Sequence, residues 1–264
     1  MSWIMMLMEL AVAGPPNRAT VVAVYDGDTF TLNTGEKVRL RGVNTPELRP
    51  KEKFGIEARD AAKEILLNQP VWLTYGEVKE DSYGRLIASV RTKDTDIGEH
   101  LLKKGLGHVF LIPPEEVDVE SYLAAQMVAK KNRDGIWSLS RYDSDFHFTS
   151  FHANAAGNDR KNVNGEYLRI CNISQKEQST GSLSIRNIKG LSFQLDDIVI
   201  PAGHTVKLHS GRGTNQSNPS RQLELYLGSN SPIWSNDHDR ATLSDTSGKV
   251  HDSRLHKPKT RPKQ

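Results

Sequence analysis

The sequence is poor in cysteine and contains no long apolar run. Cys171 is the single cysteine among 264 residues, which excludes an internal disulfide framework and a zinc site built on several thiolates. No apolar stretch reaches the ~20 residues that a membrane-spanning helix needs, so no transmembrane segment is expected. The nine histidines show neither HxH nor HExxH spacing and give no support to a zinc site on histidine.

The chain also lacks a strong excess of one charge. Its net charge is +3, and the end of the chain from Arg254 onward carries five bases and no acid. This distribution excludes a protein that binds nucleic acid simply by being basic all over. Residues 256–264 are predicted to form a basic, disordered tail. Two interpretations stay open, a solvated end without a ligand and a segment that helps to hold polyanions through salt-sensitive contacts.

Residues 1–14 are apolar and weakly resemble a signal peptide. They contain the small-residue run 11–13 near their end, but Glu9 interrupts them and they lack a basic beginning. Two interpretations stay open for residues 1–17, an N-terminal extension and a poor signal-like segment.

Residues 18–140 are predicted to form one domain in which strands come first and helices follow. Strand patterns cover residues 20–32 around an Asp-Gly pair, then 37–43, 71–75 and 85–91. Helical spacing of apolar residues covers 54–67, 97–104 and 116–131. This order favours a small β-barrel with helices packed on it, an α+β fold.

The composition and the hydrophobic pattern of the sequence change after Trp137. We expect a linker over 141–145 and a second domain over 146–255, where short strand-like runs alternate with turn formers and no helical period is found. This pattern predicts an all-β sandwich. The runs cover 146–148, 167–171, 183–185, 198–200, 205–208, 223–227 and 241–243.

Carboxylates and arginines in the first domain could form one reactive site. Asp26 and Asp28 stand two residues apart at a tight turn, and Glu47 follows a strand that carries Arg39. Arg85 leaves a second tight turn. Carboxylate oxygens suit Ca²⁺ or Mg²⁺, fixed guanidinium groups can hold a phosphodiester, and a further carboxylate can orient or deprotonate water. Together these groups would make a metal-assisted phosphodiesterase.

Three motifs in order, DGDT at 26–29, RLRGVNTPE at 39–47 and DSYGR at 81–85, closely resemble the staphylococcal nuclease (thermonuclease) family. The resemblance covers about residues 20–137 and ends with KNRDGIW at 131–137. It implies an OB-fold barrel with three helices. It also implies a Ca²⁺-dependent endonuclease that cleaves DNA and RNA to 3′-phosphate and 5′-hydroxyl ends.

By position in these motifs, the resemblance implies a metal site. Asp28 would bind Ca²⁺, Thr45 would offer its backbone carbonyl, and Asp26 would be an acidic support. Asn44 stands where the family has a second calcium-binding aspartate. An amide oxygen still binds Ca²⁺ but brings no charge, so a lower affinity is expected.

The same resemblance implies the catalytic residues. Arg39 and Arg85 would clamp the scissile phosphate, Glu47 would be the general base or would position water, and Tyr83 would contact the substrate phosphate. Where well-known members carry paired tyrosines for base stacking, this chain has Phe110 followed by LIPP. Weaker or altered substrate preference is expected from that change.

The second half resembles a lamin tail domain, an immunoglobulin-like β-sandwich, over about residues 146–253. The supporting motifs are NGEYLRICN at 164–172, IPAGH at 200–204, IWSN at 233–236 and DRATL at 239–243. The resemblance implies a module for binding or anchoring, with a protein or cell-surface partner, and its role does not follow from the fold alone.

The leading hypothesis is an active Ca²⁺-dependent nuclease joined to an accessory β-sandwich. The alternative is a non-catalytic module on an OB-fold that binds nucleic acid or protein. A secreted or envelope-associated location is expected, with a cytoplasmic one as the alternative. DNA or RNA preference and the oligomeric state stay open.

Overall fold

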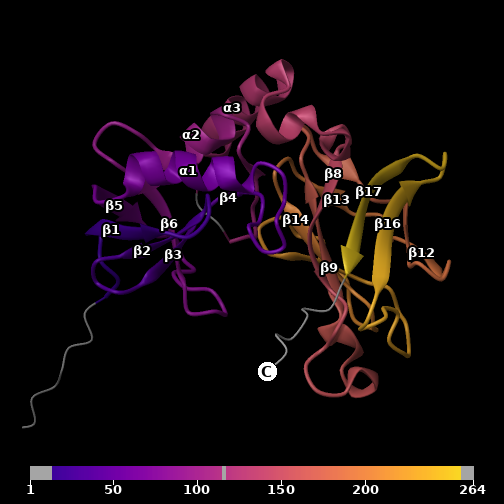
Figure 1. Cartoon of the computed structure of the whole chain (residues 1–264). Helices are drawn as coiled ribbons and strands as arrows, with labels where there is room; N and C mark the ends of the chain where they lie inside the picture. The colour runs from indigo at the N-terminus through magenta and orange to yellow at the C-terminus, as the bar shows by residue number, and fades with distance from the viewer. Residues whose placement is uncertain (1–13, 115–116, 257–264) are drawn as a thin grey trace, which may run out of the picture.

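The computed structural model describes residues 14–114 and 117–256. Its first part is a closed five-stranded barrel with strand order β1-β2-β3-β6-β5, and three helices pack on it (Figure 1). The barrel strands are β1 (Arg18–Val24), β2 (Thr29–Leu32), β3 (Lys37–Leu40), β5 (Pro70–Thr74) and β6 (Leu86–Arg91). The short strands β4 (Val43–Asn44) and β7 (His108–Val109) form a separate pair.

Alternating side chains explain the barrel. In β3 and β6 every second residue is buried, as expected for strands with one face toward a core. The β1–β2 hairpin closes over the Asp-Gly turn with Val24 opposite Phe30, and β3 pairs with β6 in parallel. The helices are α1 (Gly55–Leu66), α2 (Ile97–Lys103) and α3 (Val119–Asn132).

Asp96 caps α2 by accepting from the Glu99 N–H, and Asp118 caps α3 by accepting from the Ser121 N–H. Such caps satisfy backbone donors at a helix start.

The second part is a β-sandwich of two four-stranded sheets (Figure 1). One sheet has the order β15-β14-β9-β8 and the other the order β12-β11-β16-β17. Its first sheet contains β8 (Phe146–His152), β9 (Tyr167–Asn172), β14 (Thr205–His209) and β15 (Leu223–Tyr226). Its second contains β11 (Leu183–Arg186), β12 (Ser192–Gln194), β16 (Asp239–Asp245) and β17 (Val250–His256). A small pair adds β10 (Gln178–Ser179) and β13 (Val199–Ile200).

The two domains share a buried apolar cluster. Its members come from α3, the two 3-10 turns Gly135–Ser138 and Ser140–Tyr142, and the end of β9. They are Ala129, Ile136, Trp137, Tyr142, Cys171 and Ile173. Backbone bonds join the domains as well, because the Leu111 N–H donates to the Gly203 carbonyl at 2.9 Å and the Thr205 N–H donates to the Leu111 carbonyl at 3.0 Å. The second domain is therefore packed against the first.

The structure confirms the predicted fold classes, a barrel with helices followed by an all-β sandwich. It also shows strands that the patterns missed, β17 above all, where Asp252 is the one fully buried side chain. The expected linker 141–145 contains the buried Tyr142.

Predictions for residues 1–13 and 257–264 lie outside the described residues. Within the described ranges, no helix is both long and apolar enough to cross a bilayer.

Candidate active site

The turn between β1 and β2 places two carboxylates at one edge of the barrel. Asp26 and Asp28 are both buried, and Asp26 Oδ1 accepts from the Asp28 N–H at 3.1 Å. A Cβ at Gly27 would lie 2.7 Å from the Thr45 side chain and 2.9 Å from Ala58. Glycine is therefore required here because the turn lies so close to the neighbouring loop and to α1.

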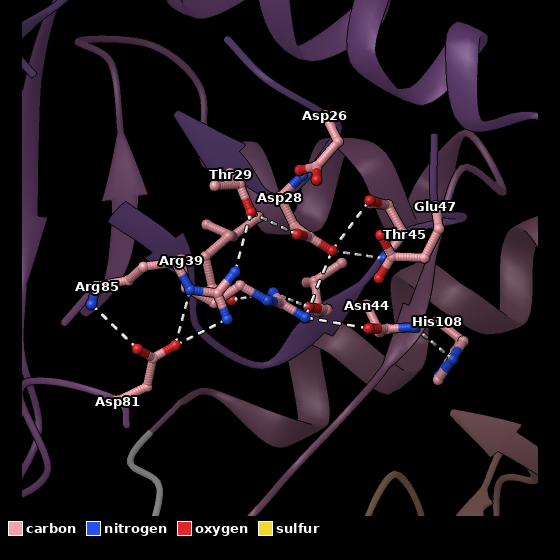
Figure 2. Close-up of polar contacts among 12 residues, drawn as sticks. Asp26, Asp28, Thr29, Arg39, Asn44, Thr45, Glu47, Asp81, Arg85 and His108 are labelled. Atoms are coloured by element: carbon pink, nitrogen blue, oxygen red, sulfur yellow. Dashed lines mark hydrogen bonds and ion pairs between the residues drawn. The ribbon is translucent and has the colours of Figure 1, made fainter. Parts of the chain in front are cut away.

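Asp28 is the centre of the polar network (Figure 2). Its Oδ2 accepts from the Thr45 N–H at 2.8 Å and from the Thr45 hydroxyl at 3.0 Å. Its Oδ1 accepts from the Thr29 hydroxyl at 3.1 Å, and Arg39 Nη2 lies 3.4 Å from Oδ2. These contacts fix both carboxylate oxygens, so the side chain has one defined orientation.

Arg39 is held in place by the loop that it borders. Its Nη1 donates to the carbonyls of Leu40 at 2.7 Å and Val43 at 2.6 Å, and its Nη2 donates to Asn44 Oδ1 at 3.1 Å. The guanidinium also lies over the Phe110 ring at 5.9 Å. Arg39 is thus a fixed cation beside Asp28 rather than a solvated surface charge.

A second fixed guanidinium belongs to Arg85. Its Nε and Nη2 lie 2.8 and 2.7 Å from Asp81 Oδ2, and its Nη1 donates to the Thr29 hydroxyl at 3.5 Å. Burial raises the pKa of Asp81, but the hydrogen bonds from Arg85 outweigh it and hold that pKa below its usual range. Tyr83 is 72% exposed beside this pair, with Arg85 5.5 Å from its ring centre.

Two carboxyls near Asp28, those of Asp26 and Glu47, have raised pKa values. Burial, and next the Asp28 carboxylate, raise the pKa of Asp26 to about 7, although Arg39 lowers it. Glu47 is exposed to solvent as a residue, but surrounding protein atoms partly desolvate its carboxyl group. This desolvation, and next the Asp28 carboxylate, raise the pKa of Glu47. A bound cation would relieve both effects.

The backbone of Glu47 is held by a loop contact that sequence reasoning missed. The Glu47 N–H donates to Glu52 Oε2 at 3.0 Å, and the Glu52 N–H donates back to the Glu47 carbonyl at 2.8 Å. Glu52 Oε1 lies 3.6 Å from Arg254 Nη2 in the second domain. Arg254 lies in β17, within the sandwich predicted for residues 146–255. No signal in the sequence links it to the nuclease motifs.

His108 is a further residue that sequence reasoning missed. Its ring is 1% exposed, with Nε2 3.5 Å from Asn44 Nδ2 and Nδ1 2.8 Å from the Val109 carbonyl. Burial lowers the pKa of His108 to about 3, so the ring is neutral. Both contacts are satisfied when Nδ1–H donates to Val109 and Nε2 accepts from Asn44. The Asn44 amide then presents Oδ1 toward Arg39.

Arg41 stands two residues after Arg39, so strand alternation predicts the same face for both. Arg41 does not join the site. Its Nη2 donates to the Ile87 carbonyl at 3.2 Å, and its guanidinium packs against Gly76. The period of the strand alone could not distinguish these two arginines.

The donor chemistry of the site fits Ca²⁺. The predicted set consists of the Asp28 carboxylate, the Asn44 amide and the Thr45 carbonyl, all of them hard oxygen donors. In the described part of the chain, no group of three or more His, Cys, Asp or Glu side chains could hold a metal. The predicted set is of another kind, with one carboxylate and two neutral oxygens. Its role in metal binding stays a prediction.

The structure brings most of the predicted site residues together at one edge of the barrel (Figure 2), and the Tyr83 ring lies beside Arg85. Thr29 bridges the two halves, since its hydroxyl donates to Asp28 and accepts from Arg85. Thr29 is the threonine of the DGDT motif, but the motif alone did not indicate what its side chain does. The contacts described above connect Asp26, Asp28, Arg39, Asn44, Thr45, Asp81 and Arg85.

The family models match both parts of the chain. A model described as "Staphylococcal nuclease homologue" matches residues 37–139, and one described as "Lamin Tail Domain" matches residues 137–257.

Several proteins named as nucleases are similar to the first part of the chain. A thermonuclease of Staphylococcus hyicus is 36% identical over 125 residues, which cover 45% of this chain and 74% of that protein. A thermonuclease of Staphylococcus intermedius is 36% identical over 124 residues, covering 44% and 74%. The endonuclease YhcR of Bacillus subtilis is 33% identical over 132 residues, covering 44% of this chain and 11% of its own length. The chain therefore belongs to the staphylococcal nuclease family and carries a lamin tail domain after its nuclease domain.

Proposed function

We propose that this nuclease is a Ca²⁺-dependent endonuclease that hydrolyses DNA or RNA to 3′-phosphate and 5′-hydroxyl ends. The observation that carries the proposal is the joint placement of Arg39, Arg85 and Asp28 at one edge of a family barrel, with Glu47 close enough for Asp28 to raise its pKa. Thermonucleases and endonucleases among its relatives support the reaction class.

Asp28, Asn44 and Thr45 would hold the metal. Bound there, Ca²⁺ would supply positive charge to the phosphate oxygens and orient the reacting groups. The surrounding hydrogen bonds to Asp28 keep its carboxylate in one position without any ligand.

The two arginines would contribute to phosphodiester binding in different ways. Arg39 already donates to two carbonyls and an amide oxygen, so it acts mainly as fixed positive charge. Arg85 is anchored through Nε and Nη2, whereas its Nη1 makes only a long 3.5 Å contact to Thr29. Nη1 therefore keeps donor capacity for a phosphate oxygen, whose growing negative charge it would oppose.

Glu47 would take the proton from the attacking water. The water oxygen forms the new bond to phosphorus, the bond to the 5′-oxygen breaks, and that oxygen takes a proton from solvent. A raised pKa makes Glu47 a better proton acceptor when ionised, which favours this role near neutral pH. The products are a 3′-phosphate and a 5′-hydroxyl.

Analysis of the product ends tests the proposed reaction. Single-stranded DNA, duplex DNA and RNA labelled at one end are incubated with the full chain, with Ca²⁺ or with chelator. The proposal predicts Ca²⁺-dependent fragments whose 3′-phosphate is removed by a phosphatase. Intact nucleic acid that stays bound to the folded protein would instead favour the non-catalytic binding module.

Export of the protein and a protein or cell-surface partner for the lamin tail domain remain part of the proposal. The apolar start of the chain motivates the first expectation. Detection of the native protein outside the cytoplasm would support it, and exclusive recovery from cytoplasm would contradict it.

A further inference from the structure

A polar pocket of about 340 Å³ lies on the lamin tail domain, away from the nuclease motifs. It combines two cationic side chains with amide and hydroxyl groups, and its lining contains no acid. The polar lining residues are Lys161, Asn162, Asn164, Arg212, Ser229 and Asn230. Such a set offers hydrogen-bond donors and positive charge, which suit a phosphodiester.

The pocket is built by fixed contacts. Asn164 Nδ2 donates to the Arg212 carbonyl at 2.9 Å, and the Gly228 N–H donates to the Gly211 carbonyl at 2.9 Å. A Cβ at Gly211 would lie 2.5 Å from Asn164 Oδ1, so glycine permits the close approach of the two segments. The pocket is thus formed without a ligand.

A row of aromatic rings connects the pocket to the rest of the sheet. His152, Tyr167, His209 and Tyr226 stand opposite one another on β8, β9, β14 and β15. Neighbouring ring centres lie 4.4, 6.4 and 4.7 Å apart. The row spans about 14 Å, three strand spacings, and His209 Nδ1 lies 3.1 Å from the carbonyl of Asn164 in the pocket wall.

The other side of the row approaches the candidate active site. Arg39 of that site lies over the Phe110 ring at 5.9 Å, and the next residue, Leu111, accepts from the Thr205 N–H at the start of β14. Lys207 lies over the Tyr167 ring at 4.3 Å, and in the sheet it stands opposite Arg169. Strand β14, which carries Lys207 and His209, begins at the backbone contact with Leu111 of the nuclease domain.

The charge of this face also favours an anionic ligand. Lys207 and Arg169 stand opposite each other on β14 and β9 and add two cations to this face. Glu224 is the carboxylate that stands opposite Lys207 on β15, and its oxygens already accept from Gln222 Nε2 at 2.8 Å and from the Tyr226 hydroxyl at 3.1 Å.

From this continuity we infer that the lamin tail domain binds a single nucleic-acid strand that extends from the nuclease site. The strand would pass Lys207 and the aromatic row and place a phosphate in the pocket between Lys161 and Arg212. We call this surface the strand-binding track. The inference rests on the proposed function, because the nuclease site supplies the strand. Unpaired bases suit the accessible parts of His152, Tyr167 and Tyr226, whereas His209 is buried within the row. The sugar-phosphate backbone suits the cations.

Binding of single-stranded DNA under conditions that prevent cleavage tests whether the strand-binding track exists. Fluorescence anisotropy of a labelled 20-nucleotide oligo(dT) is measured with the full chain in chelator. The variant Lys161→Gln/Arg212→Gln is compared with Arg186→Gln/Lys189→Gln, which removes two exposed cations from the other sheet and its adjoining turn. The first variant is expected to raise Kd about tenfold and to reduce the salt slope by about 0.7, which corresponds to the one phosphate held in the pocket. The control is expected to change Kd less than about twofold, as surface charges without a phosphate contact should.

Three further results complete the test. Lys207→Gln should weaken binding as well, and it serves as the test if the pocket variant does not fold. The ratio of kcat/KM for a 20-nucleotide strand to that for a trinucleotide should fall in the pocket variant. A 20-base-pair duplex should bind more weakly than the single strand.

Equal Kd values for the pocket variant and its control would overturn the inference, and so would duplex binding as tight as single-strand binding. A wild type that binds the strand but never cuts it in Ca²⁺ would refute the proposed function and leave the track supported. A wild type that cuts, with Kd values unaffected in the pocket variant, would refute the track alone.

Discussion

Arg254 of the lamin tail domain lies 3.6 Å from Glu52 of the nuclease domain, Nη2 to Oε1. The other oxygen of Glu52 accepts from the Glu47 N–H at 3.0 Å, and Arg254 Nη1 donates to the Phe148 carbonyl at 2.7 Å. Because each contact uses a different atom, all of them coexist. The second domain thus helps to fix the loop that carries the proposed general base.

Replacing Arg254 should slow cleavage without weakening substrate binding. In Arg254→Gln the Glu52 carboxylate loses its partner, and kcat is expected to fall up to about fivefold, since a partly exposed ion pair contributes about 0–1 kcal/mol. KM should change little, and Arg254→Lys should restore most of kcat. Hydrogen exchange at the Glu47 amide should become faster in the glutamine variant, which gives a readout independent of activity.

Arg133→Gln is the matched control, because it removes a more exposed ion pair, Arg133 with Asp143 at 3.3 Å. Equal kcat values for Arg254→Gln and Arg133→Gln, with unchanged exchange at Glu47, would show that Arg254 does not position the loop.

Asp81 should affect catalysis through Arg85, although it is not one of the predicted metal ligands. It holds Arg85 through Nε and Nη2, and charge-assisted bonds of this kind are worth about 1.5–3 kcal/mol. Asp81→Asn is therefore expected to lower kcat/KM about tenfold. Glu77→Gln, an exposed carboxylate of the same connection, is the control. Steady-state kinetics on single-stranded DNA would contradict this role if the two variants behaved alike.

Asn44→Asp should lower the Ca²⁺ concentration needed for half-maximal activity, because a carboxylate adds charge to the metal site. The same change should destabilise the metal-free protein. The new oxygen would face the lone pair of His108 Nε2, where Asn44 now places its amide nitrogen, and it would add charge near Asp28.

Melting temperatures in chelator and in Ca²⁺ separate these two effects. We expect a lower value in chelator and a larger rise on adding Ca²⁺ than in the wild type. An unchanged Ca²⁺ requirement would mean that Asn44 is not a ligand.

Stability should fall as the pH drops below about 6.5. Burial lowers the pKa of His147 in the folded protein, although Asp252 at 2.8 Å raises it. The unfolded chain then binds a proton that the folded chain binds less well, so stability falls with decreasing pH by up to about 1.4 kcal/mol per pH unit. Asp252, with its lowered pKa, stabilises the fold above its unfolded pKa, and this contribution is lost only as the pH falls through its folded pKa.

Urea unfolding between pH 7.5 and pH 5 measures this dependence. His147→Gln should show a shallower slope than the wild type, whereas the exposed His238→Gln should not. An identical slope in His147→Gln would contradict the assignment.

Most of the nuclease barrel could be predicted because local patterns determine it. Alternation marks β3 and β6, and helical spacing marks α1, which spans Gly55–Leu66 where residues 54–67 were expected. Strand β17 escaped prediction because its fully buried side chain is a carboxylate, Asp252, which accepts from the Phe148 N–H at 2.8 Å. A buried, paired carboxylate carries no hydrophobic signal.

The predicted site residues come from motifs, and the structure brings them together. Their supports could not be found this way, because His108 and Arg254 lie 64 and 210 residues from Asn44. Such contacts depend on how β7 and β17 pack against the site, which no local pattern in the sequence encodes.

The most direct test of the central claim is the rate of single-stranded DNA cleavage with and without Ca²⁺. Glu47→Gln should lose a factor of about 10²–10⁴ and Arg85→Ala about 10²–10³. The exposed Glu57→Gln and Arg91→Ala should stay near wild type, and chelator should abolish cleavage. Cleavage by Glu47→Gln and Arg85→Ala at the wild-type rate, or cleavage that persists in chelator, would contradict the account.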